Sequence, residues 1–130
     1  MRPEPCDLLI EPRWLLPVAP ENTVLTNTGL VVRDGRIIAL GPVAELRRAW
    51  SPATAISLPR HALLPGLVNA HGHAAMSLLR GVAEDAPLET WLQQHIWPLE
   101  GRLVDADFVR DGTRLAAAEM LRSGTTCFSD

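Results

Sequence analysis

Residues 64–73 read LPGLVNAHGH, the most informative segment of this 130-residue chain. Its apolar content predicts a mostly buried strand over residues 63–73. Side chains two positions apart on a strand point to the same side, so Asn69, His71 and His73 are expected to share one face. At a rise of about 3.3 Å per residue, the Cα atoms of the two histidines would lie roughly 6–7 Å apart. From there both imidazoles can reach one metal ion at a distance of about 2.0–2.1 Å. A pair that only packs or lines a polar surface is the alternative interpretation.

The residues after this segment predict two helices and a second strand. Residues 88–97 carry an apolar stripe at helical spacing, and Pro98 is expected to stop that helix. A helix over 106–123 is capped by Asp105 and followed by Gly124, and residues 125–130 have strand-forming content. The order strand, helices, strand implies a parallel pair, which belongs to a larger α/β sheet or barrel. We therefore expect a fragment, with a complete small domain as the alternative. The apolar stripe of the helix expected over residues 88–97 consists of Leu88, Trp91, Leu92 and Ile96.

The first half of the chain is predicted to be rich in β-structure. Its clearest unit is a hairpin over residues 30–40, in which Asp34-Gly35 suits a two-residue type I′ turn. We place a soft boundary near residue 62, which divides the chain into a β-rich segment at 1–62 and a second part at 63–130. The other expected elements are strands over residues 7–10, 14–18 and 53–58 and a helix over residues 43–50.

Composition excludes several classes of protein. The formal net charge is -3 and all 12 basic residues are arginine, so neither bulk nucleic-acid binding nor lysine Schiff-base or P-loop chemistry is expected. No stretch approaches the roughly 18 apolar residues of a membrane span, and the N-terminus lacks a signal-peptide pattern. We expect a cytoplasmic protein without nucleic-acid or membrane partners, with Cys6 and Cys127 reduced. A homo-oligomer is compatible with the sequence.

The same residues resemble the metal-dependent amidohydrolases, which carry a His-x-His at the end of the first barrel strand. Asp34–Gly41 resembles the hairpin of their N-terminal β-sandwich, and Leu64–His73 resembles their first barrel strand. Within that superfamily, Met76–Asp85, Leu88–Leu92 and Trp97–Glu100 are similar to the deaminases of S-adenosylhomocysteine and 5′-methylthioadenosine. The resemblance implies an α/β fold: the N-terminal part of a (β/α)8 barrel, incomplete here, preceded by a small β-sandwich segment.

The resemblance also implies roles for three residues. His71 and His73 would be ligands of a single divalent metal ion, expected to be zinc, and Glu100 would accept hydrogen bonds from the ribose hydroxyls of a small-molecule nucleoside. The implied reaction is attack of a metal-activated water on C6 of the purine, with loss of ammonia. The family's remaining ligands and its proton-shuttling glutamate lie on later strands. No catalytic residue is therefore assigned in this chain, and the segment alone is expected to be inactive.

Several alternatives remain open at this stage. Guanine deaminase, cytosine deaminase and the triazine chlorohydrolases use a similar scaffold, and Glu100 separates them because a free base has no ribose. Without the resemblance, Glu100 reads as a solvated residue after a helix stop. A non-catalytic metal-binding module is the alternative of another class. Asn69 could donate a hydrogen bond to a metal ligand or form a turn, Trp91 could line a pocket or pack in a core, and neither His61 nor His95 is assigned a role.

Overall fold

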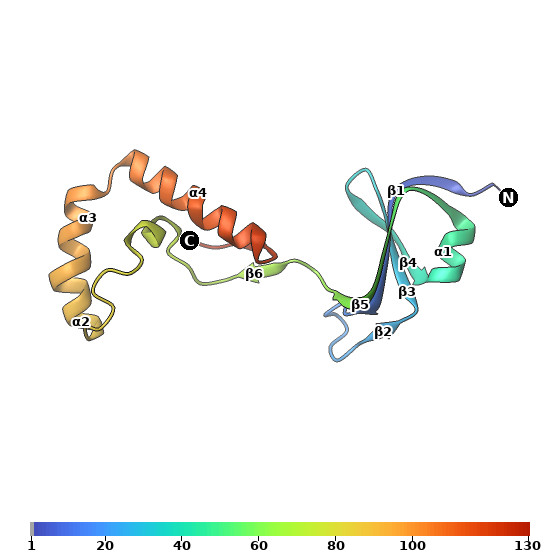
Figure 1. Ribbon diagram of the computed structural model, residues 1–130, viewed down its shortest axis with the longest axis horizontal. Helices are drawn as coiled ribbons and strands as arrows, with labels where there is room; N and C mark the ends of the chain where they lie inside the picture. Colours follow the sequence, from blue (N-terminus) through green and yellow to red (C-terminus); the bar gives the residue numbers. More distant parts are fainter. Residues whose placement is uncertain (1) are drawn as a thin grey trace. The chain divides into compact units, whose positions relative to one another are not determined.

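The computed structural model describes residues 2–130 and divides into two compact units, Met1–Pro65 and Gly66–Asp130. Each unit has its own sheet (Figure 1). Within residues 2–130, no helix combines the length and the apolar character needed to span a membrane. The chain is thus a mixed α/β protein, and each unit can be understood from its own residues.

The sheet of the first unit is built around its first strand, β1. That strand pairs in parallel with β5 and antiparallel with β2 and β3, and β4 follows β3 at the edge. The elements are β1 (Glu4–Leu15), β2 (Leu25–Thr26), β3 (Thr28–Arg33), β4 (Arg36–Pro42), α1 (Val43–Ala49) and β5 (Trp50–Leu63).

Two strand predictions in this unit are wrong in extent. The expected strands 7–10 and 14–18 form one strand, β1, because Pro12 stays in register with Leu58 of β5. The strand expected to end at Leu58 continues to Leu63, because the pairing shifts register between Pro12 and Trp14 and resumes at Trp14 with Ala62. A bulge of this kind accommodates a proline, because proline has no N–H to donate to the hydrogen bonds between the strands.

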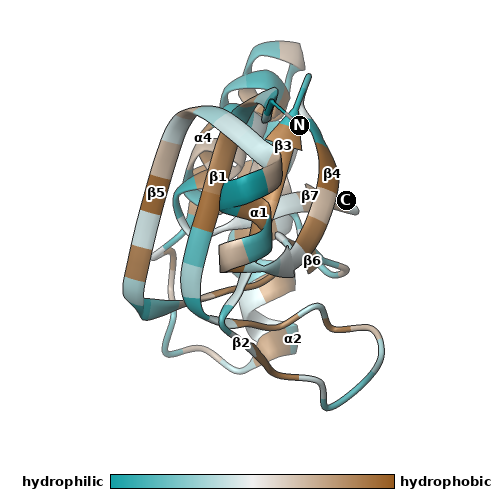
Figure 2. Ribbon diagram, turned by 90° about the vertical axis from the view of Figure 1, so that its right-hand side faces the viewer, coloured by the Kyte–Doolittle hydropathy of each residue, from teal (hydrophilic) through white to brown (hydrophobic). Residues whose placement is uncertain are grey.

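The predicted hairpin and helix of the first unit are confirmed. Asp34 and Gly35 have φ angles of 52° and 69°, both positive as a type I′ turn requires, and Asp7 Oδ2 accepts a hydrogen bond from Asp34 N at 2.7 Å. Figure 2 shows the apolar bands on β1 and β3. The core that they form with α1 consists of Cys6, Leu9, Val31 and Leu46.

Cys6 and Cys127 are free thiols, and burial raises the pKa of Cys6.

The second unit contains a parallel strand pair and a set of helices. Pairing of β6 with β7 confirms the predicted parallel arrangement. The long helix α4 is also confirmed, because Asp105 caps it by accepting from Phe108 N at 2.7 Å and Gly124 follows it with a φ of +87°. The elements are β6 (Leu67–Asn69), the 3-10 helix η1 (Ala74–Leu79), α2 (Leu88–Thr90), the π-helix η2 (Trp91–Ile96), α3 (Trp97–Leu103), α4 (Ala106–Arg122) and β7 (Thr125–Phe128).

The buried strand predicted over residues 63–73 is wrong. Leu63 ends β5, and β6 covers only Leu67–Asn69. Leu67 and Val68 are 51% and 68% exposed. Within residues 2–130, β7 is the only strand that pairs with β6, so one edge of β6 lies unpaired and its faces are only partly covered.

The helix predicted to stop at Pro98 is also wrong at that point. The helical path continues through Pro98, which lies at the start of α3, and ends at Leu103. The preceding turns, Trp91–Ile96, are a π-helix. A wider turn relieves the clash of a proline ring with the carbonyl four residues earlier and needs no N–H from the proline. Of the expected apolar stripe, Ile96 is fully buried whereas Leu88 is 70% exposed.

We expect Gly112→Ala to destabilise the second unit. A Cβ at Gly112 of α4 would clash with the backbone oxygen of Ala75 in η1, and backbone cannot move aside cheaply. The resulting overpacking should cost about 1–3 kcal/mol, more than the gain of about 1 kcal/mol in helix propensity. The matched control is Gly101→Ala in α3, where a Cβ meets nothing within 4 Å. Urea unfolding of the full-length protein should show a lower midpoint for the first variant and an unchanged or higher one for the control. Equal midpoints for the two variants would contradict the close contact.

Candidate functional site

The two histidines of the HGH segment lie side by side in the loop that follows β6. Their ring centroids are 5.6 Å apart and the ring planes meet at 82°. A ring centroid lies about 1.1 Å behind its nitrogen, so two imidazoles bound to one tetrahedral zinc ion have centroids about 5 Å apart. The centroid distance of His71 and His73 is close to that value. The predicted closeness of the rings is present, but it arises in a loop and not from the alternation of a strand, which ends at Asn69.

Hydrogen bonds hold the backbone on both sides of the pair. Asn69 Oδ1 accepts from His71 N at 3.2 Å, and the backbone oxygen of Asn69 accepts from Ser129 N at 3.0 Å. Beyond the second histidine, Asp130 Oδ1 accepts from Ala74 N at 2.8 Å. Of the two roles considered for Asn69, the structure shows the turn.

The pair does not form a complete metal site by itself. Within residues 2–130, no group of three or more His, Cys, Asp or Glu side chains is placed to hold an ion. A catalytic zinc usually has three protein ligands and one open position. Two neighbouring imidazoles fit part of such a site.

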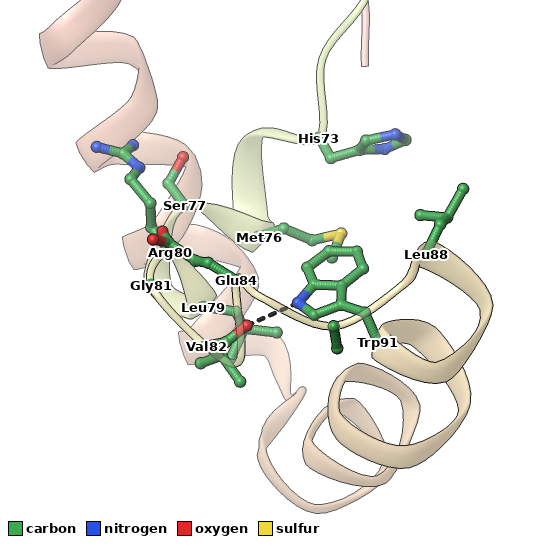
Figure 3. Close-up of a pocket in the computed structure, with 11 residues that line it drawn as sticks. His73, Met76, Ser77, Leu79, Arg80, Gly81, Val82, Glu84, Leu88 and Trp91 are labelled. Atoms are coloured by element: carbon green, nitrogen blue, oxygen red, sulfur yellow. Dashed lines mark hydrogen bonds between the residues drawn. The ribbon is translucent and has the colours of Figure 1, made fainter.

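A pocket of about 580 Å³ opens beside His73 (Figure 3). Trp91 forms one wall, and its indole Nε1–H donates to the backbone oxygen of Val82 at 2.6 Å. Figure 3 shows the sulfur of Met76 next to the Trp91 ring, with His73 across the opening. Leu88 also lines this space, which explains why an apolar residue of the predicted helical stripe is exposed. Trp91 thus lines a pocket rather than a closed core.

Arg80 lies at the border of the same pocket and is held in an ion pair. Its guanidinium donates to both carboxylate oxygens of Glu119 at 3.0 and 2.7 Å. This pairing lowers the pKa of Glu119 and raises that of Arg80. Both side chains are well exposed, so the pair adds little to stability, but it engages the guanidinium that could otherwise meet an anionic ligand.

Glu100 lies half-buried on α3 and is not among the residues that line the pocket beside His73. Its role as a ribose-binding carboxylate stays a prediction. His61 lies on β5 in the first unit and His95 on η2, and neither joins a metal-binding group within residues 2–130.

Two residues of this region were missed or misread from the sequence. The contact of Asp130 with Ala74 joins positions 56 apart, which no local pattern reveals. Met76 lines the pocket, although a methionine by residue type alone favours a core position. Local sequence patterns could not have found either, because both depend on which segments meet after folding.

Comparison with known proteins gives several matches. The model of the amidohydrolase family matches residues 62–130, and that of an imidazolonepropionase-like composite domain of bacteria matches residues 29–50. A 5-methylthioadenosine/S-adenosylhomocysteine deaminase of Saccharophagus degradans is 55% identical over 126 residues, 97% of this chain but 28% of that protein. A second protein of that name, from Teredinibacter turnerae, is 49% identical over 95% of this chain and 28% of its own length.

A solved structure is also similar. The crystal structure of an adenosine deaminase from Xanthomonas campestris with bound zinc has a TM-score of 0.93 and 54% identity, and the match covers 98% of this chain and 29% of that one. This chain thus spans less than a third of the length of the relatives it matches. The resemblance drawn from the HGH segment is confirmed, and because the family model covers more than half of its residues, this chain belongs to the amidohydrolase family.

Proposed function

We propose that this chain is part of a metal-dependent deaminase that hydrolyses the adenine moiety of 5′-methylthioadenosine and S-adenosylhomocysteine. The products are the inosyl counterparts and ammonia. The observation that carries the proposal is the 55% identity, over 97% of this chain, with a protein named for that activity. Because the chain covers 28% of that relative, we expect the activity in a longer protein and not in this segment alone.

We further propose the architecture that such an enzyme needs. Residues 1–62 would belong to a β-sandwich, and residues 63–130 would provide the first strand, the helical excursion and the second strand of a (β/α)8 barrel. Support comes from the parallel pairing of β6 with β7, because a barrel of this type is built from parallel strands. In such barrels the active site lies at the carboxyl ends of the strands, where the HGH segment follows β6.

The proposal gives the residues of this chain three tasks. His71 and His73 would hold a divalent ion, expected to be zinc, through neutral imidazole nitrogens. When bound, such an ion makes a water molecule acidic enough to act as a nucleophile at neutral pH. Glu100 would accept hydrogen bonds from two ribose hydroxyls, because an ionised carboxylate only accepts and has two oxygens. The pocket beside His73, with Met76 and Trp91, offers an apolar surface next to the reacting centre.

The decisive experiment measures ammonia release by the full-length protein. We expect turnover of 5′-methylthioadenosine and S-adenosylhomocysteine, and none of guanine, cytosine or atrazine. Activity confined to a free base would replace the proposal by guanine or cytosine deamination. Hydrolysis of atrazine would release chloride instead of ammonia, so a chloride assay is run beside the ammonia assay, and activity confined to atrazine would replace the proposal by triazine hydrolysis. The likeness to atrazine chlorohydrolase of Arthrobacter aurescens, with a TM-score of 0.75 at 21% identity, shows a shared fold only.

A second experiment tests the reading of this chain as a complete, non-catalytic metal-binding module. Such a module should be monodisperse and unfold cooperatively. The proposed part of a barrel exposes an unpaired strand edge and apolar surface, so the isolated chain should aggregate or melt without cooperativity. A thermal melt of the isolated chain with light scattering separates the two. A sharp reversible transition of this chain, together with no zinc-dependent activity in the full-length protein, would favour the module.

A further inference from the structure

We propose that Asp130 is a positioning residue that fixes the HGH segment so that its two imidazoles stay side by side. The inference rests on the proposed role of His71 and His73 as metal ligands, and it assigns to Asp130 a task on the backbone, not on the ion. It starts from the hydrogen bond at 2.8 Å between Asp130 Oδ1 and Ala74 N, the residue directly after the second histidine.

The backbone at this point needs an acceptor. Ala74 is the first residue of η1 and is only 5% exposed, so water has little access to its N–H. The first N–H groups of a helix have no partner within the helix. His73 occupies the cap position but makes no side-chain cap hydrogen bond. Asp130 therefore supplies from a different strand the acceptor that a local capping residue usually supplies.

The other end of the segment is held in the same way. Asn69 Oδ1 accepts from His71 N at 3.2 Å, and Ser129 N donates to the backbone oxygen of Asn69 at 3.0 Å. One hydrogen bond thus restrains the backbone at the first histidine, and another restrains it just after the second. Between them lies Gly72, where the chain has no side chain to limit its own motion.

The topology explains why residues so distant in sequence meet here. Because β6 and β7 are parallel, their carboxyl ends lie at the same edge of the sheet. Asn69 is the last residue of β6, and Asp130 follows the end of β7 by two positions. The acceptor therefore reaches the loop from the neighbouring strand end.

A direct role of Asp130 as a third ligand is less well supported by the geometry. Its Oδ1 is already engaged with Ala74 N, and no group of three metal-binding side chains forms in the part of the chain that the structure describes. The two roles differ in what the side chain must offer. A backbone acceptor requires only a carbonyl-type oxygen at that position, which an amide also provides, whereas a carboxylate ligand requires its charge.

The test compares variants of the full-length protein by competition for zinc with a chromophoric chelator. Asp130→Ala should lower zinc affinity about tenfold, the low end of the range for residues that orient metal ligands. Asp130→Asn keeps an oxygen acceptor and should stay within about threefold of the wild type. The control is Asp105→Ala, which removes a carboxylate that caps α4 in the same unit, and it should lower the melting temperature but not zinc affinity.

Each outcome decides the matter. Unchanged affinity in Asp130→Ala, an equal loss in Asp105→Ala, or a loss in Asp130→Asn as large as on removal of a histidine would overturn the positioning role. If Asp130→Ala does not fold, Asn69→Ala takes its place at the other end of the segment and should lower affinity severalfold, with Asp130→Asn still near the wild type. His71→Ala separates this inference from the proposed function: if that variant binds zinc as tightly as the wild type, the metal site itself fails.

Discussion

Replacing His71 or His73 by alanine in the full-length protein is expected to lower both zinc content and deamination of 5′-methylthioadenosine by more than about 100-fold. Substitution of residues that only orient metal ligands lowers metal affinity or activity about 10- to 100-fold, and loss of a ligand should lower them further. The imidazoles lie 5.6 Å apart, so removal of either leaves the ion with one ligand from this segment. Metal analysis of the purified variants and an ammonia assay provide the two measurements.

The chain offers matched controls for this result. His61 lies on β5 and His95 on η2, outside the HGH segment, and neither has been assigned a role. His61→Ala and His95→Ala should keep their zinc and most of their activity. Should His71→Ala retain zinc while a control variant loses it, the ion would lie elsewhere and the histidine pair would be a packing feature.

Glu100→Gln is expected to lower kcat/KM for 5′-methylthioadenosine by about 10- to 100-fold. A hydrogen bond to a charged group is worth about 1.5–3 kcal/mol, and each 1.4 kcal/mol is a factor of ten. The amide replaces one of the two carboxylate acceptors by a donor and removes the charge, while it keeps the size of the side chain. Steady-state kinetics measures the effect. The control is Glu89→Gln on α2, an exposed glutamate whose recorded side-chain partner is Gln93.

A substrate without ribose hydroxyls makes this prediction specific. If Glu100 accepts from those hydroxyls, the wild type should lose activity on the 2′,3′-dideoxy analogue, and Glu100→Gln should cost little further with that analogue. Two full and additive losses would mean that the carboxylate acts elsewhere. That outcome would remove the ground for preferring nucleosides to free bases, which is the proposed contact of Glu100 with the ribose. The position of Glu100 on α3, outside the lining of the pocket beside His73, gives it no other link to the substrate.

Elements with strong local signals were predicted correctly. The hairpin around Asp34 and Gly35 formed because both positions adopt the positive φ angles of the turn that their residue types favour. Helix α4 begins and ends as predicted because Asp105 caps it and Gly124 ends it. In each case the turn or cap conformation is set by residues within a few positions of one another.

Predictions failed where a distant segment decides the conformation. The continuous β1 depends on its pairing with β5, in which the register shifts between Pro12 and Trp14. The helical path through Pro98 depends on the π-turn before it, a backbone adjustment that periodicity does not indicate. The exposure of Leu67 and Val68 depends on what pairs with and covers β6, which the apolar content of the strand cannot reveal.

The same distinction between local signals and long-range contacts applies to the candidate site. Residue types and spacing pointed to His71 and His73 as a pair and to the parallel strands, because those depend on the order of residues along the chain. The resemblance of the HGH segment and its neighbours pointed to the family, and the family model confirmed it. Only the folded structure shows three further features: the loop that carries the pair, the hydrogen bond that Asp130 Oδ1 accepts from Ala74 N, and the pocket wall formed by Trp91 and Met76. These contacts join residues as many as 56 positions apart, and such long-range hydrogen bonds and packing leave no trace in local periodicity.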